Sequence, residues 1–183
     1  MGKKVFLTIL FCILTSLASA RDKVFNATID RIVDGDTVWV KHAGQKTKLR
    51  LLGIDTPEKN YSRKMYRDCR SCNVKQKQMQ YLGRLASRHA RLYLKKGQKV
   101  KVEIYGRGFY GRKLAIIYLP GGQDFNALMV RDGYACVYKY RGHKSRELPE
   151  DEWEKLNLLL ERAKTERRGL WKEFYDIMDC LCN

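Results

Sequence analysis

The sequence predicts an α+β fold: an OB-like five-stranded β-barrel with three helices. Five short segments rich in Val, Ile, Thr and Leu alternate with Gly-containing turns. A long amphipathic segment separates the third of these segments from the fourth. Three strands, a helix and two further strands is the element order of an OB-like barrel.

The five expected strands are short and bounded by turn residues. The first three form a meander broken at Asp34-Gly35 and Ala43-Gly44, and the last two flank a Gly-rich connection. We expect these strands at Val24–Arg31, Thr37–His42, Thr47–Leu52, Lys99–Ile104 and Leu114–Leu119.

Three further segments carry helix signals. Apolar residues recur at helical spacing over Val74–Lys96, which Gly97 closes. Asp124 can cap a short helix that runs to Arg131 and stops at Gly133, and a longer helix at about Glu150–Arg168 follows Pro149. Residues Asn60–Asn73 are polar and aperiodic and are expected to form a loop, whereas Trp171 is expected to pack back on the barrel.

The N-terminus has the pattern of a secretory signal. Lys3 and Lys4 precede the apolar run Val5–Leu17, which ends in Ala18-Ser19-Ala20, so cleavage is expected after Ala20. A retained membrane anchor is the alternative. We expect residues 1–20 to be a signal peptide and residues 21–183 a single domain with a Cys-containing tail at 172–183. The mature chain would be secreted or periplasmic, without stable membrane association.

The charge of the chain predicts a polyanionic partner. The sequence has 37 Lys and Arg against 20 Asp and Glu, a formal net charge of +17. Charge alone does not distinguish nucleic acid from an anionic membrane surface or a cell-wall polymer. We expect a monomer.

Three separated motifs hold an unusual set of charged residues: Asp34-Gly35-Asp36-Thr37, then the stretch from Arg50 to Glu58 (RLLGIDTPE), then Tyr110-Gly111-Arg112. Together they resemble the signature of the staphylococcal nuclease family. The similarity continues through Asn126-Ala127-Leu128, Arg131-Asp132-Gly133 and Gly169-Leu170-Trp171, so it covers nearly all of the expected mature chain.

Two aspartates near strand ends are candidate metal ligands. Asp36 begins one strand and Asp55 lies just beyond another, and two carboxylates at a barrel rim can bind a hard cation through oxygen. The resemblance implies that Asp36 and Asp55 bind Ca²⁺, with the backbone carbonyl of Thr56 as a further ligand. Ordinary turn chemistry is the alternative for these residues.

Glu58 and two arginines are candidate catalytic residues. Pro57 limits where the chain can place Glu58, whose carboxylate could orient water and accept its proton. Arg50 stands inside an apolar strand segment, where a guanidinium is costly unless it meets an anion. The resemblance nominates Arg50 and Arg112 as the pair that stabilises charge on the phosphoryl group. For Arg50, an outward position on a half-buried strand is equally compatible with the periodicity.

Aromatic residues beside cations suit the bases and phosphates of a single strand. Tyr110, Tyr138 and Tyr140 are such residues and are candidate substrate contacts. The tyrosines after Gly133 stand about one residue out of register with the family pattern, and core packing is the alternative for each of them.

Two cysteine pairs have no counterpart in the resemblance: Cys69 with Cys72, and Cys180 with Cys182. Four thiolates could close a zinc site, but an exported protein favours disulfides between the two pairs. Cys136, within an apolar stretch, is expected to be a buried thiol.

The resemblance implies a secreted, calcium-dependent endonuclease that hydrolyses DNA and RNA to 3′-phosphate and 5′-hydroxyl ends. A non-catalytic nucleic-acid-binding OB-fold module is the first alternative, and a protein that binds a wall polymer or a membrane is the second. Neither alternative needs the carboxylates Asp36, Asp55 and Glu58.

Overall fold

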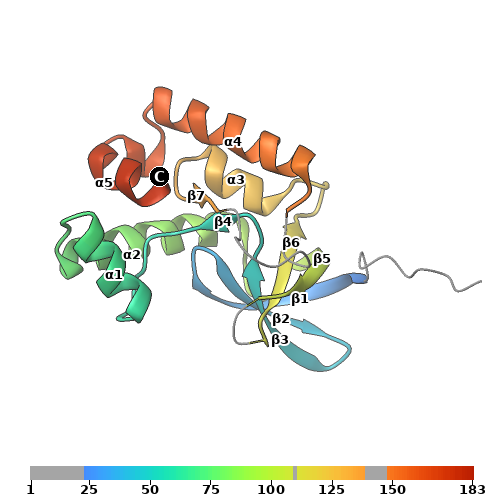
Figure 1. The fold of residues 1–183 in the computed structure, drawn as a ribbon. Helices are drawn as coiled ribbons and strands as arrows, with labels where there is room; N and C mark the ends of the chain where they lie inside the picture. Colours follow the sequence, from blue (N-terminus) through green and yellow to red (C-terminus); the bar gives the residue numbers. More distant parts are fainter. Residues whose placement is uncertain (1–22, 109–110, 139–147) are drawn as a thin grey trace, which may run out of the picture.

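The computed structural model describes residues 23–108, 111–138 and 148–183, and five of its strands form a closed barrel (Figure 1). The strands occur at the expected places, and β1 and β5 are longer than expected. The barrel strands are β1 (Lys23–Asp34), β2 (Thr37–His42), β3 (Gln45–Leu51), β5 (Lys99–Arg107) and β6 (Lys113–Tyr118). The expected OB-like α+β fold is confirmed.

The barrel closes in the order β1-β2-β3-β6-β5. The first strand pairs antiparallel with both β2 and β5, whereas β3 and β6 pair in parallel and complete the ring. The interior is filled by aliphatic side chains that are fully buried, among them Val38, Val40, Leu49, Val102 and Ile117. Buried and more exposed residues alternate over residues 38–41 of β2 and over residues 99–103 of β5, as expected for strands with one buried face.

A small second sheet lies beside the barrel. It consists of β4 (Ile54–Asp55) and β7 (Cys136–Val137), which pair antiparallel so that Asp55 lies opposite Cys136. The sequence did not predict this pairing. It matters for the site because it fixes the backbone of Asp55 immediately after the barrel strand β3.

The three expected helices are present with slightly different bounds. They are α2 (Gln76–Tyr93), α3 (Phe125–Arg131) and α4 (Glu150–Thr165). Asp124 caps α3 as expected, because its carboxylate accepts the amide proton of Ala127 at 3.1 Å. In Figure 1, α3 and α4 lie side by side above the barrel. Trp171, in the 3₁₀ turn η3 (Gly169–Trp171), is buried, as predicted.

Two helices are present that the sequence did not predict. Residues 60–73, predicted as a loop, contain α1 (Arg63–Ser71), and the tail, for which no secondary structure was predicted, contains α5 (Tyr175–Cys182). The described residues therefore contain five α-helices rather than three. Helix α1 is largely polar, and its buried residues, Met65 and Cys69, are few; their i, i+4 spacing after the N-cap Ser62 is the local signal that could have revealed it.

Two disulfides attach α5 to the rest of the fold. Cys72 is bonded to Cys180, as one of the predicted pairings, and Cys136 is bonded to Cys182. The expectation that Cys136 is a free buried thiol is wrong. Cys69 is the free, buried cysteine among the described residues. Because three of the four proposed zinc ligands are in disulfides, the four-thiolate zinc site is not formed.

No helix in the described part of the chain is long and apolar enough to span a bilayer. The expected signal peptide, residues 1–20, lies outside the described residues.

Candidate active site

Asp36 is the buried centre of the site. It follows the turn between β1 and β2, and its Oδ2 accepts hydrogen bonds from both Thr56 N (2.9 Å) and Thr56 Oγ1 (3.1 Å). Thr37 Oγ1 donates to Oδ1 at 3.0 Å. A Cβ on Gly35 would lie 2.7 Å from Thr56 Cγ2, so the absence of a side chain at residue 35 lets the two segments approach.

Arg50 lies between the two aspartates. It is opposite Thr37 in the β2–β3 register, which directs its guanidinium into the rim of the barrel. Its Nη1 is 2.8 Å from Asp36 Oδ2, and its Nη2 is 2.6 Å from Asp55 Oδ1. Only 14% of its side chain is exposed, so the alternative of an outward, solvated Arg50 is wrong. The pair of ionic contacts satisfies an arginine that would otherwise be costly in an apolar strand.

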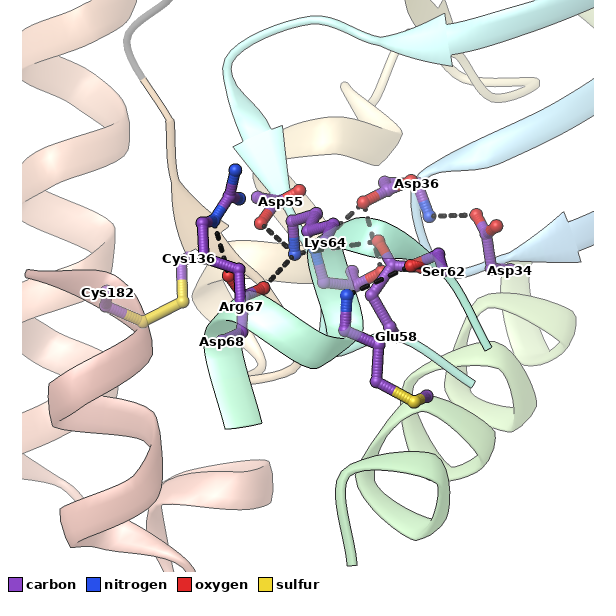
Figure 2. Close-up of polar contacts among 12 residues, drawn as sticks. Asp34, Asp36, Asp55, Glu58, Ser62, Lys64, Arg67, Asp68, Cys136 and Cys182 are labelled. Carbon is purple, nitrogen blue, oxygen red and sulfur yellow. Dashed lines mark hydrogen bonds and ion pairs between the residues drawn. A yellow bond between two sulfur atoms is a disulfide. The ribbon is translucent and has the colours of Figure 1, made fainter. Parts of the chain in front are cut away.

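Lys64 is a second cation in the site that the sequence analysis missed. It projects from α1, with Nζ 2.9 Å from Asp55 Oδ2, 2.8 Å from Asp68 Oδ2 and 3.6 Å from Glu58 Oε1. Figure 2 shows its ammonium group among these three carboxylates. Lys64 and Asp68 have the i, i+4 spacing of a helical ion pair, but nothing in the sequence connects this pair to Asp55.

Glu58 is held near both aspartates by the chain that follows Pro57. Ser62, the N-cap of α1, donates its hydroxyl to Glu58 Oε2 at 3.3 Å. The backbone of residues 57–59 rests on α2 at Gly83, where a Cβ would lie 2.5 Å from Lys59 N and 2.6 Å from the Glu58 carbonyl carbon. Gly83 is therefore a positioning residue, and a glycine inside an amphipathic helix is the signal that could have identified it.

Four carboxylates form what we call the acidic cluster: Asp34, Asp36, Asp55 and Glu58. Burial and the nearby Asp36 carboxylate raise the pKa of Asp34 to about 7. Burial also raises the pKa of Asp55 and of Glu58, although Lys64 opposes both shifts. For Asp36, burial alone would raise the pKa, but the Arg50 guanidinium and hydrogen bonds with Asp34 and the Thr56 amide outweigh it and lower the pKa.

The pKa values of the two cations, Arg50 and Lys64, are also raised. Burial alone would lower the pKa of Arg50 and of Lys64, but the neighbouring carboxylates outweigh burial and raise both. Both side chains therefore remain cationic at any pH at which the acidic cluster is ionised.

Arg112, the second arginine that the resemblance nominates, lies near Arg50. Both line a pocket of about 40 Å³ that also includes Gly53 and Tyr138. Tyr138 is 44% exposed, and its amide donates to the Gly53 carbonyl at 2.8 Å. Tyr110 and Tyr140, the two other predicted substrate contacts, lie outside the described residues.

The chemistry of the acidic cluster fits a hard cation. Asp36 and Asp55 point toward the same guanidinium and offer only oxygen donors, and the four carboxylates of the acidic cluster outnumber the two cations, Arg50 and Lys64, that contact them. Oxygen ligands and excess negative charge suit Ca²⁺. In the described residues, however, no group of three or more His, Cys, Asp or Glu side chains is already arranged as a metal site. Arg50 and Lys64 occupy the carboxylates that would face the cation.

The fold and the site together define the class of this protein. It is an OB-like barrel with an acidic cluster and two arginines at its rim. Comparison with known proteins places it in a family: residues 48–173 match the family described as "Staphylococcal nuclease homologue". The chain belongs to the staphylococcal nuclease family.

Several curated relatives are similar over most of this chain. An uncharacterized endonuclease of Escherichia coli O157:H7 is 31% identical over 78% of this chain and 74% of its own length. Micrococcal nuclease of Shigella flexneri is 31% identical over 81% of this chain and 75% of its own. Endonuclease YhcR of Bacillus subtilis is 27% identical over 85% of this chain, which spans only 12% of that protein.

Proposed function

We propose that the protein is a secreted or periplasmic, calcium-dependent endonuclease that hydrolyses phosphodiester bonds of DNA and RNA. The observation that carries the proposal is the contact of one guanidinium, Arg50, with both Asp36 and Asp55, beside Glu58. Family membership and relatives named as nucleases support the same activity.

In this proposal the arginines bind and stabilise the phosphate. Arg50 is already held at the rim by β3, and Arg112 lies across the same small pocket. Two preorganised guanidinium groups stabilise the charge that grows on the phosphoryl oxygens in the transition state. Tyr138 borders this pocket and, with Tyr110 and Tyr140, is proposed to contact the nucleoside.

Glu58 is proposed to orient the attacking water and accept its proton. Ser62 and Lys64 hold its carboxylate in place, and burial raises its pKa toward the range in which a carboxylate can accept a proton effectively. Attack on phosphorus with departure of the 5′ oxygen would leave 3′-phosphate and 5′-hydroxyl ends.

Asp36, Asp55 and the Thr56 carbonyl are the proposed calcium ligands. These residues offer the oxygen ligands that calcium prefers, and a calcium ion held there would supply positive charge to polarise a phosphate oxygen. Thr56 also positions Asp36 through its amide and hydroxyl groups. The Arg50 guanidinium, which contacts both aspartates, lies beside this proposed set of ligands.

The test is cleavage by the purified protein, expressed without residues 1–20, on plasmid DNA and on RNA. We expect activity with calcium, none with excess chelator, and products with 3′-phosphate and 5′-hydroxyl ends. Asp36→Asn and Asp55→Asn should weaken calcium binding and cleavage together. Binding of nucleic acid without cleavage under all of these conditions would favour the non-catalytic binding module instead.

Export is tested separately by expressing the full chain and sequencing the N-terminus of the product outside the cytoplasm. We expect it to begin at Arg21 and to migrate as a monomer. A chain that retains its first twenty residues and remains with the membrane would support the anchor alternative.

A further inference from the structure

Helix α1 has an inner face toward the acidic cluster and an outer face toward solvent. The inner face carries Lys64 and Asp68, which contact each other beside Asp55. The outer face carries Arg63, Tyr66, Arg67 and Arg70, at the i, i+3, i+4, i+7 spacing that places residues on one side of a helix, and all four are exposed.

An exposed aromatic pair lies at the start of this outer face. Tyr61 and Tyr66 are 62% and 52% exposed, yet their rings stack on each other, with centroids 6.3 Å apart and planes 21° apart. Two exposed tyrosine rings in contact form an apolar surface that burial in the core does not explain. Tyr61 immediately precedes Ser62, whose hydroxyl donates to Glu58.

The charge around the pair is positive. Arg63 and Arg70 have no ion pair with a residue that the structure describes, whereas Arg67 Nε pairs with Asp68 Oδ1 at 3.2 Å. Stacking faces flanked by unpaired arginines are the chemistry that recognises bases and phosphates of a single strand. A protein partner with an acidic surface would not require the paired rings.

The outer face is held rigidly relative to the acidic cluster. At its start, Ser62 caps the helix by accepting the Met65 amide proton at 3.0 Å, and just past its end Cys72 is bonded to Cys180. Met65 and Cys69 fix the inner side by burial. A platform fixed in this way loses little conformational entropy when a strand binds.

We propose that Tyr61 and Tyr66, with Arg63 and Arg70, form a stacking subsite for a single-stranded segment of the nucleic-acid substrate. The proposal rests on the proposed nuclease function. It adds the path of the nucleic-acid strand, which leaves the acidic cluster along the outer face of α1. A single OB fold contacts about 4–16 nucleotides, so a subsite beginning next to Ser62 lies within the expected footprint.

The proposal is tested by binding and cleavage of substrates of different length. Tyr61→Ala/Tyr66→Ala should weaken binding of a 12-nucleotide single strand about five- to thirtyfold, measured by fluorescence anisotropy in the Glu58→Gln background. Binding of a blunt duplex of the same length should weaken less than twofold, because its bases are already stacked. With Glu58 intact, kcat/KM on a dinucleotide should stay within twofold.

Matched variants separate stacking from folding and from general charge. Tyr61→Phe/Tyr66→Phe keeps both rings and should bind within twofold of the parent, whereas Tyr81→Ala removes an exposed tyrosine from α2 and should have no effect. Arg63→Ala/Arg70→Ala should lower the salt dependence of single-strand binding by about 1.4 in log–log slope, for two phosphates. Arg84→Ala/Arg88→Ala, two exposed arginines of α2, should lower it by less than half as much.

Unchanged single-strand affinity of the Tyr61→Ala/Tyr66→Ala variant, in a protein that still cleaves, would overturn the subsite and leave the nuclease proposal standing. An equal loss on duplex and dinucleotide would also overturn it, since that pattern reports damage to the fold. If the parent protein neither cleaves nor binds any of the substrates, the nuclease proposal itself fails.

Discussion

The Lys64 ammonium group bridges two carboxylates, with Nζ 2.9 Å from Asp55 Oδ2 and 2.8 Å from Asp68 Oδ2. Lys64 therefore places a positive charge beside Asp55, which is one of the proposed calcium ligands. Figure 2 shows the three side chains together.

Lys64→Met is expected to tighten calcium binding about fivefold, because like charges a few ångströms apart repel even at an effective dielectric near 20. The same change should lower stability in chelator, since Asp55 and Asp68 lose their shared partner. Calorimetric titration with calcium measures the first effect. Lys155→Met is the matched control, because Lys155 also contacts two carboxylates, at 3.1 Å from Asp124, the N-cap of α3, and at 2.8 Å from Glu152 of α4. Unchanged or weaker calcium affinity of the Lys64→Met variant would contradict the prediction that Lys64 competes with calcium for Asp55.

Glu58→Gln is expected to reduce kcat by about 10²–10⁴ while nucleic-acid affinity stays nearly constant, because the proton acceptor is lost and the arginines remain. Single-turnover cleavage together with equilibrium binding separates the two quantities. Glu154→Gln, on an exposed position of α4, is the control and should be indistinguishable from the parent. A Glu58→Gln variant within threefold of the parent kcat would remove Glu58 from the mechanism.

Arg112 and Arg107 have the same local Tyr-Gly-Arg sequence but different surroundings. Arg112 shares a pocket with Arg50, whereas Arg107 is exposed at the end of β5 and donates to the Gly111 carbonyl at 3.3 Å. We expect Arg112→Ala to lower kcat by about 10² or more, the scale of losing one preorganised donor. Arg107→Ala should leave kcat unchanged and reduce the salt dependence of binding by about one phosphate contact. The reverse pattern would move the catalytic assignment to Arg107.

The two disulfides should differ in their effect on activity. In the chain-entropy model, closing loops of 108 and 46 residues stabilises by up to about 5 and about 4 kcal/mol respectively. Loss of Cys136–Cys182 should also lower kcat, because Cys136 lies opposite Asp55 in the β4–β7 pair. We expect a larger kcat loss for Cys136→Ser/Cys182→Ser than for Cys72→Ser/Cys180→Ser, measured well below each variant's Tm. Equal kcat values would show that the β4–β7 pair does not need the bridge.

Thiol chemistry checks the connectivity. On reduction, the intact mass should increase by the hydrogens that two opened disulfides take up. Cys69 should react with an alkylating reagent only after unfolding, because it is buried and burial raises the pKa of its thiol. Peptide mapping that joins Cys69 to the C-terminal segment would contradict the pairing.

Asp34 should make stability fall as pH rises in the absence of calcium. Its pKa is raised to about 7 in the folded protein, against about 3.9 when unfolded, so between these values the folded state binds more protons. The free energy of unfolding should therefore decrease from about pH 4 to pH 7, by at most about 1.4 kcal/mol per pH unit from this group. Asp34→Asn should remove this contribution, as urea denaturation in chelator at pH 5 and pH 8 would show. If the free energies of unfolding of variant and parent differed by the same amount at pH 5 and at pH 8, the prediction for Asp34 would be contradicted.

Much of the fold could be predicted because it is encoded locally. The barrel strands follow from short aliphatic segments and Gly turns, and α3 from its Asp124 cap. Asp36 and Asp55 could be nominated together because both stand near strand ends at one rim, whereas Arg50 was nominated by the family resemblance. The structure brings the three side chains together, because the Arg50 guanidinium contacts both carboxylates.

What the sequence by itself determined is the set of short barrel strands, their order along the chain and the two aspartates near strand ends, since these follow from local residue patterns and turns. Only the tertiary structure decided that residues 63–71 are helical, that Cys136 joins Cys182 and that Lys64 enters the acidic cluster. These features depend on contacts between α1, α5 and the β4–β7 pair. The free energy of such contacts comes from residues far apart in the chain, and neither periodicity nor motif spacing records it.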